Sequence, residues 1–375
     1  MKLFVKSIGT FIIAMSIFAG CSKESGNLNP ENPPQEPYIP ALRVEGRAVV
    51  AYVTYYGSGL PDPQLCTHIH YAFAELYVSG GKYQKFALKG GERRFKEVVN
   101  LKKQNPDLKI LLSFSNSVSN ADNSTGGGFS VLSGSKENRV AFANDCLEFC
   151  KEYGIDGIDL DWEFPGLDWS GQPVDPLHDV DNHVLLMKQL RETLGNNYLL
   201  TYAGYVMDKQ PASGGGYRYI DIAALDEVVD YVNLMTYEMD AGNKPHNALR
   251  CSSAYWDIER TYKAYINAGA TPGKLVLGIP FYGRASRSAN PSALTYKSIM
   301  NLGKEYIIEN WDSNASVPYV TRNGVIYCYY DNARSIEIKA KWARERFFYG
   351  LMYWENDQDD NKYTLRRATW EGVMK

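Results

Sequence analysis

The stretch GIDGIDLDWEFPG, Gly154–Gly166, places four acidic residues among apolar neighbours. Because side chains alternate between the two faces of a strand, Asp159, Asp161 and Glu163 share one face. The opposite face is apolar apart from Asp156, to which we therefore assign a structural role. The stretch predicts a β-strand that has one acidic face and one apolar face.

Apolar runs of similar length recur along the chain and predict the fold. They are RAVVAYVTYY (47–56), THIHYAFAEL (67–76), LKILLSFS (108–115), GIDGIDLDW (154–162), YLLTYAGY (198–205), VDYVNLMTY (229–237), KLVLGIPFYG (274–283) and GLMYWEN (350–356). Helical patterns such as NHVLLMKQLRETLG (182–195) separate most of them, which indicates a parallel sheet of the α/β class. Eight such units close into a (β/α)8 TIM barrel. A doubly wound open sheet is the alternative, but no GxGxxG turn follows the first run.

The interval between the seventh and eighth runs is longer than one helix needs. It contains VPYVTRNGVIYCYYD (317–331), two alternating aromatic segments around Asn323 and Gly324, which predict a β-hairpin. We expect a small β-containing insertion at about residues 285–335, between strands 7 and 8. The stretch ARSIEIKAKWARERFF (333–348) is predicted to be the helix that leads back to the last strand.

The N-terminus reads MKLFVKSIGTFIIAMSIFAGC, two lysines ahead of a short apolar run that ends at Cys21. The run is too short to span a membrane in the mature protein, so residues 1–21 are interpreted as an export signal. Its end resembles the lipobox of bacterial lipoproteins, which implies cleavage before Cys21 and lipidation of that residue. An ordinary secretory signal is the alternative. Residues 22–43 are polar and Pro-rich and predict an extended tether, which leaves 44–375 for the barrel.

This N-terminus gives an expected location. The signal and tether predict an exported protein, anchored by lipid to a bacterial membrane, most simply the outer one, and facing the periplasm or the cell surface. We expect the membrane to be contacted through this anchor alone and the protein to be a monomer.

Composition narrows the classes of partner. The 375 residues include 40 Lys and Arg and 43 Asp and Glu, and this net charge of −3 gives no field that attracts nucleic acid. Beyond Cys21 there are five cysteines, an odd number that argues against a complete disulfide framework. Cys146 and Cys150 are interpreted as buried thiols in a helix. The 28 Tyr and 7 Trp include faces suited to sugar rings.

The acidic face of the opening stretch suggests acid catalysis. Catalytic side chains in a (β/α)8 barrel lie at the C-terminal ends of the strands, and Pro165 and Gly166 place Glu163 at that rim. Residues two apart on a strand are separated by ~6.6 Å, so Asp161 lies beneath Glu163 and Asp159 beneath Asp161. Like charges at this spacing raise one pKa and favour a shared proton. A protonated Glu163 is then a general acid for an oxygen leaving group.

A divalent metal site is the weaker alternative. Carboxyls on one strand stand in a line and do not surround an ion, and no nearby histidine has partner spacing. We expect no metal and no cofactor.

The motif DGIDLDWE, residues 156–163, matches DGxDxDxE, so the chain resembles the chitinases of glycoside hydrolase family 18. The resemblance extends over about residues 47–360. It implies substrate-lining roles for Tyr52, Phe73, Met235, Glu238, Tyr282, Arg284, Met352 and Trp354. For Arg284, a structural ion pair near the rim is an equal alternative.

The resemblance also implies retaining hydrolysis in which the substrate supplies the nucleophile. Glu163 would protonate the glycosidic oxygen while the sugar's own 2-acetamido oxygen attacks the anomeric carbon. Asp161 would hold the acetamido N–H, with Asp159 supporting it. Tyr237 would position the acetamido carbonyl, and Trp354 would form the floor under the distorted sugar.

The sequence departs from the family pattern at two places. Ser115 and Asn116 stand at the end of the third run, where the family has glycines, and Glu238 replaces the Asp of the MxYD pattern. The extra methylene of Glu238 places specificity or pH optimum in question. The insertion is also short, which suggests a shallow groove.

The sequence is compatible with three functions. The first is hydrolysis of β-1,4 links next to N-acetylglucosamine in chitin or chitooligosaccharides. The second is endo-β-N-acetylglucosaminidase action on the chitobiose core of N-glycans, although DLDWEFP (159–165) resembles chitinases more closely. The third is a non-catalytic lectin, which the retained Glu163, Asp161 and Tyr237 disfavour.

Overall fold

The computed structural model describes residues 46–118, 128–167, 171–206, 220–254 and 256–375. The predicted signal, Cys21 and the predicted tether lie outside the described residues. Within the described ranges, no helix combines the length and the apolar character needed to cross a membrane.

Within these ranges, parallel strands form a closed eight-stranded barrel. Its order is β1, β14, β8, β7, β6, β5, β4 and β2, and β2 pairs back with β1. The strands are β1 Ala48–Thr54, β2 His68–Ser79, β4 Lys109–Val118, β5 Gly157–Asp161, β6 Leu199–Gly204, β7 Tyr231–Leu234, β8 Leu275–Pro280 and β14 Gly350–Trp354. Each overlaps one of the eight apolar runs, so the (β/α)8 prediction is confirmed.

The barrel strands are buried on both faces because two separate apolar clusters use them. On β1, Val49, Ala51 and Val53 pack in the cluster between strands and helices, whereas Val50 and Tyr52 belong to a second cluster inside the barrel. This arrangement explains why the runs are continuously apolar and do not alternate with polar residues. The same inner cluster includes side chains at the C-terminal end of the strands, such as Tyr237, and Trp354 packs against it.

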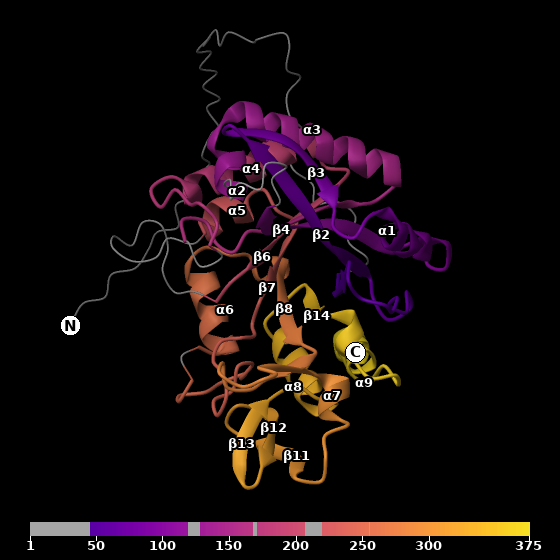
Figure 1. The fold of residues 1–375 in the computed structure, drawn as a ribbon, viewed down its shortest axis with the longest axis vertical. Coiled ribbons are helices and arrows are strands. Elements are labelled where there is room, and N and C mark those ends of the chain that lie inside the picture. The colour runs from indigo at the N-terminus through magenta and orange to yellow at the C-terminus, as the bar shows by residue number, and fades with distance from the viewer. Residues whose placement is uncertain (1–45, 119–127, 168–170, 207–219, 255) are drawn as a thin grey trace, which may run out of the picture. The chain divides into compact units, whose positions relative to one another are not determined.

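Helices cover the outside of the strands (Figure 1). The α-helices described are α1 Glu92–Val99, α2 Gly128–Gly134, α3 Lys136–Tyr153, α4 Asp179–Leu194, α5 Ile222–Asp226, α6 Ile258–Asn267, α7 Tyr296–Ile299, α8 Ala333–Arg344 and α9 Thr364–Met374. Short 3-10 helices are η1 Asn100–Lys103, η3 Pro272–Lys274 and η4 Asn356–Gln358. Cys146 and Cys150 are buried free thiols on α3, as predicted.

Two local features differ from the sequence-based expectation. Strand β2 runs beyond Leu76 and forms a hairpin with the antiparallel strand β3, Lys82–Leu88, which the sequence did not predict. Helix α4 begins at Asp179, a few residues before the predicted stretch. Asp179 accepts hydrogen bonds from the backbone N–H of Gly166 and Asp175 and from Ser130, and it thereby ties the loop after β5 to this helix.

The predicted insertion is present as a second antiparallel sheet. Its order is β10 Ala293–Thr295, β9 Tyr282–Arg284, β13 Val325–Tyr329, β12 Val317–Arg322 and β11 Tyr306–Asp312 (Figure 1, orange). The hairpin turns at Asn323 and Gly324, both with positive φ, as a two-residue turn of this hand requires. The sheet begins at Tyr282, directly after β8, and so joins the insertion to the barrel rim.

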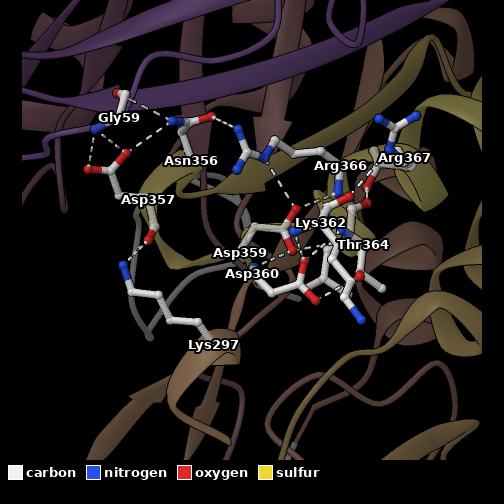
Figure 2. A network of polar contacts seen from close by, with 12 residues as sticks. Gly59, Lys297, Asn356, Asp357, Asp359, Asp360, Lys362, Thr364, Arg366 and Arg367 are labelled. Atoms are coloured by element: carbon white, nitrogen blue, oxygen red, sulfur yellow. Dashed lines mark hydrogen bonds and ion pairs between the residues drawn. The ribbon is translucent and has the colours of Figure 1, made fainter. Parts of the chain in front are cut away.

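A polar network follows β14 and joins the β1–β2 loop to helix α9, and we call it the C-terminal clasp (Figure 2). Asp357 accepts hydrogen bonds from the backbone N–H of Gly59, in the β1–β2 loop. Arg366 on α9 donates to Asp359 and Asn356, each at 3.2 Å. The acidic side chains of the clasp therefore accept bonds from the protein itself, and they fix the segment that directly follows Trp354.

Candidate active site

A cavity of about 600 Å³ lies where the parallel strands end. Nine of its lining residues were predicted from the sequence: Tyr52, Phe73, Asp161, Glu163, Met235, Tyr237, Glu238, Tyr282 and Trp354. Four other lining residues were not predicted from the sequence: Phe164, Ala203, Tyr205 and Arg287. The carboxyl ends of β1, β2, β5, β7 and β14 thus contribute to one site.

Asp159 lies beneath this cavity, fully buried inside the barrel. Its carboxylate accepts hydrogen bonds from Thr201 Oγ1 (2.6 Å), Ser113 Oγ (2.8 Å) and Tyr52 Oη (2.9 Å), and His70 Nδ1 lies 3.1 Å away. Burial alone would raise the pKa of Asp159, but His70 and the hydroxyl donors outweigh it and hold the pKa below its ordinary value. Asp159 is therefore an ionised carboxylate.

Asp161 and Glu163 line the cavity above Asp159. Burial raises the pKa of Asp161 well above its ordinary value, and the charges of Glu163 and Asp159 raise it further. Burial also raises the pKa of Glu163, although a hydrogen bond from Asp161 opposes that shift. The two carboxyls titrate together and hold a proton between them. One oxygen of Asp161, Oδ1, is buried without a hydrogen-bond partner among the described residues.

The apolar face of the opening stretch packs away from the cavity. Trp162 stacks on Phe129 of α2, with ring centroids 5.4 Å apart. Asp156 accepts hydrogen bonds from Lys102 Nζ (2.6 Å) and from the backbone N–H of Ile110 (2.8 Å). The structural role predicted for Asp156 is confirmed.

Aromatic side chains form the rest of the cavity wall. The Trp354 ring lies 5.5 Å from Tyr52 and is stacked on Phe73 at 5.8 Å, measured between centroids. Tyr237 follows β7, and burial and the nearby charges of Asp161 and Glu163 raise the pKa of its phenol well above the ordinary value. Its hydroxyl therefore stays protonated and is able to donate a hydrogen bond.

Glu238 occupies the position where the family pattern has Asp. Its Oε1 accepts a hydrogen bond from the Tyr282 hydroxyl at 2.8 Å, and its Oε2 lies 2.9 Å from Arg284 Nη2. The longer side chain thus directs its carboxylate to the insertion strand β9. For Arg284, the structure contains the ion pair given as one interpretation, and this residue does not line the cavity.

Met352 and Ser115 both lie inside the barrel and outside the lining of the cavity. Met352 is buried inside the barrel beneath the cavity and does not line it, because it points into the inner apolar cluster. Ser115 is buried on β4 directly opposite Asp161 in the strand register. The side chain of Asn116 lies outside the described residues.

Among the residues that the structure describes, no group of three or more His, Cys, Asp or Glu side chains is placed to hold a metal ion.

Comparisons with known proteins agree with this geometry. The family model described as glycosyl hydrolases family 18 matches residues 48–359. Chitinase A1 of Niallia circulans is 29% identical over 317 residues, which cover 71% of this chain and 43% of that protein. Chitinase 1 of Aphanocladium album is 26% identical over 370 residues, covering 84% of this chain and 82% of that one.

Solved structures share the fold. A family 18 N-acetylglucosaminidase from Paenibacillus barengoltzii has a TM-score of 0.73 and 26% identity, covering 87% of this chain and 99% of that one. The chitinase ChiW of a Paenibacillus strain has a TM-score of 0.75 and 25% identity. The match covers 88% of this chain but 43% of ChiW, so the chain corresponds to less than half of that multi-modular protein.

Proposed function

The chain belongs to family 18 of the glycosyl hydrolases, a family of chitinase-like glycosidases, and from this premise we propose its substrate and mechanism. The proposed substrates are chitin or chitooligosaccharides, cut at β-1,4 links next to N-acetylglucosamine. The observation that supports this most strongly is that Asp161 and Glu163, whose pKa values burial raises, line the cavity above Asp159, whose pKa His70 and the hydroxyl donors lower.

In the first step, Glu163 gives its proton to the glycosidic oxygen as the bond between that oxygen and the anomeric carbon breaks. The carbonyl oxygen of the sugar's 2-acetamido group forms a new bond to the anomeric carbon, so an oxazolinium ion replaces an enzyme ester. The leaving sugar departs with a neutral hydroxyl. Glu163, now a carboxylate, is the base for the second step.

Asp161 and Tyr237 support the acetamido group in this proposal. Oδ1 of Asp161, buried and without a hydrogen-bond partner among the described residues, is an acceptor for the acetamido N–H, which becomes more acidic as the oxazolinium forms. The neutral Tyr237 hydroxyl donates to the acetamido carbonyl oxygen and aligns it for attack. Trp354, with Tyr52 and Phe73 behind it, supplies an apolar face for the sugar ring.

In the second step, Glu163 takes a proton from water while the water oxygen attacks the anomeric carbon. The bond to the acetamido oxygen breaks and the acetamido group is restored. Two inversions at one carbon give net retention, so the first product formed is the β-anomer.

The test uses wild type and Glu163→Gln with chitin oligomers and, separately, with a high-mannose glycoprotein. We expect wild type to release the β-anomer from chitin oligomers, as followed by proton NMR, and the variant to lose at least about a hundredfold in kcat. Release from the glycoprotein alone would assign the enzyme to N-glycans. Cleavage of neither substrate would contradict both, and full activity in the variant would contradict the role of Glu163.

We also propose that the protein is exported and anchored by lipid at Cys21, on the sequence observations at its N-terminus. Cells producing wild type or Cys21→Ser are grown with labelled palmitate. Label in wild type and none in the variant supports the anchor, and equal label or no label in either contradicts it.

A further inference from the structure

His70 is a fully buried histidine on β2 that the mechanism above does not use. Its Nδ1 lies 3.1 Å from Asp159 Oδ2, and its Nε2 lies 2.8 Å from the Tyr231 hydroxyl. Its ring packs on Tyr52, with centroids 4.9 Å apart. His70 therefore bridges β5 and β7 one layer beneath the cavity.

The contact with Asp159, at 3.1 Å, favours a proton on Nδ1 of His70, the nitrogen that Asn233 Nδ2 approaches only to 3.5 Å. An ionised carboxylate only accepts hydrogen bonds, so the Nδ1–H must point to Asp159. The Tyr231 hydroxyl, which is able to donate to Nε2, completes a chain of contacts from Tyr231 through His70 to Asp159. The imidazole acts here as a rigid donor.

Asp159 is supplied with donors from four strands. Tyr52 is on β1, Ser113 on β4 and Thr201 on β6, and all three donors are hydroxyls that are able to rotate and accept instead. His70 differs from them because its ring is fully buried and packed on Tyr52, with Nδ1 facing Asp159 Oδ2. With its proton on Nδ1, His70 requires Asp159 to be an acceptor.

This requirement affects Asp161. A protonated Asp159 would offer Asp161 a hydrogen-bond partner below, whereas an Asp159 occupied by donors leaves Asp161 to bond upward to Glu163. The hydrogen bond between Asp161 and Glu163 is the one that the structure contains. The donors to Asp159 thus determine that the proton of Asp161 is directed to Glu163.

We propose that His70 is a positioning residue for the reaction, whose Nδ1–H keeps Asp159 an ionised acceptor and so directs the proton of Asp161 to Glu163. This inference rests on the proposed function for its kinetic consequence. The titratable groups that face His70 are Asp159 on β5, Tyr231 on β7, Tyr52 on β1 and His68 on β2.

The chain offers a matched control on the same strand. His68 is also fully buried, two residues before His70, and its Nδ1 lies 2.8 Å from Thr67 Oγ1. Its contacts in the described residues involve Thr67 and the rings of Tyr231 and Tyr349, and none involves a carboxyl group. Loss of its imidazole disturbs packing without changing the donors to Asp159.

The kinetic test measures kcat and KM against pH for wild type, His70→Leu, His70→Asn and His68→Leu with a chitin oligomer. Without the Nδ1–H, Asp159 binds a proton at higher pH. We therefore expect His70→Leu to move the acidic limb of the profile upward by about one pH unit and to lower kcat about tenfold, with little change in KM. In His70→Asn the side-chain amide N–H replaces Nδ1–H as a donor to Asp159, so we expect the acidic limb to return to its wild-type position.

Several results would overturn the proposal. These are an unshifted limb in His70→Leu, an equal shift in His68→Leu, or a folded His70→Asn that behaves like His70→Leu. If His70→Leu does not fold, Tyr231→Phe is used, because it frees the imidazole to rotate. An upward shift of the same limb supports the proposal, and an unchanged limb contradicts it.

A readout that needs no activity separates this proposal from the proposed function. Ring ¹⁵N NMR of wild type is expected to show His70 with a protonated Nδ1 and an accepting Nε2 at neutral pH, and to show the same tautomer in His68→Leu. An unprotonated Nδ1 overturns the inference even in an active enzyme. Failure to cleave either substrate, with the expected tautomer, contradicts the proposed function alone.

Discussion

Asp159 and Asp161 stand two residues apart on the same face of β5, and both are buried, yet their pKa values shift in opposite directions. Asp159, in the lower layer, is surrounded by hydroxyls and an imidazole that donate to it. Asp161, in the upper layer, has carboxyls above and below and one oxygen without a partner in the described residues. Depth of burial is nearly the same for the two side chains.

The comparison shows that neighbouring donors, and not burial, decide the charge of a carboxyl in this barrel. Burial penalises the charged form of both residues. At Asp159, hydrogen-bond donors stabilise the carboxylate and outweigh that penalty. At Asp161, the nearest groups are the acids Glu163 and Asp159, which raise its pKa further. The lower layer is therefore a fixed negative charge, and the upper layer stores the proton that the reaction uses.

The largest expected effect comes from removing the carboxyl of Asp161 from the upper layer. Asp161→Asn cannot exchange a proton with Glu163, so we expect kcat on chitin oligomers to fall by about 10²–10⁴-fold. Asp156→Asn is the matched control, because Asp156 lies on the other face and pairs with Lys102. Steady-state kinetics of the two purified variants decide the question, and comparable losses in both would contradict the division into two faces.

The two layers should respond to neutralisation with opposite changes in stability. The lowered pKa of Asp159 means that its carboxylate stabilises the fold above the ordinary Asp pKa, and that this stability is lost as pH falls. Asp159→Asn should therefore lose about 3 kcal/mol at pH 8, because donors are left unpaired. The raised pKa of Asp161 means that its ionisation costs the folded state more as pH rises, so Asp161→Asn should gain at least about 1 kcal/mol there.

Urea unfolding of both variants at pH 8 and pH 5 measures these changes. The gain in Asp161→Asn should shrink towards pH 5, where the wild-type carboxyl is neutral in the folded protein and closer to neutral in the unfolded one. Losses of equal sign and size in the two variants would show that the layers do not differ in charge.

A smaller effect is expected when one donor is removed from the lower layer. Thr201→Val deletes a hydrogen bond to a charged group, which should cost about 2 kcal/mol of unfolding free energy and move the acidic limb of activity to higher pH. Thr369→Val is the control, because its hydroxyl donates to the carbonyl of Leu365 on α9. The control should cost about 1 kcal/mol of unfolding free energy. A pH profile that also moved in the control would show that the shift in Thr201→Val does not come from the lost donor to Asp159.

The smallest effect concerns the rim. The charge of Glu238 raises the pKa of Glu163, so Glu238→Gln should lower that pKa and move the alkaline limb of activity to lower pH. We expect kcat at the optimum to change little, since Glu238 is bound to Tyr282 and Arg284 and does not carry the proton. An unmoved alkaline limb would show that the charge of Glu238 does not affect the pKa of Glu163.

The strand pattern was sufficient to predict the barrel and the acidic column. Continuous apolar runs indicate strands that are buried on both faces, and the two-residue period places Asp159, Asp161 and Glu163 in one line. The donors to Asp159 could not be predicted in this way, because their role depends on strand register. Ser113 and Thr201 lie directly opposite Asp159 on the two flanking strands, and each is a polar residue inside an apolar run.

The rim was harder to predict than the barrel. Arg287 belongs to the insertion, and its place in the cavity depends on how β9 and β10 turn. The ion pair of Glu238 with Arg284 depends on the reach of one extra methylene group. Such contacts come from loops, which carry no periodic signal.

The pairing of β1 with β14 has a consequence for biosynthesis. The rim contact between Thr54 and Glu355 joins residues 301 positions apart. At ribosomal rates that interval takes ~15–60 s, during which the barrel cannot close. The burial that raises the pKa values of Asp161 and Glu163 is a property of the closed barrel. The proton that the reaction uses therefore depends on the last strand as much as on the sequence of β5.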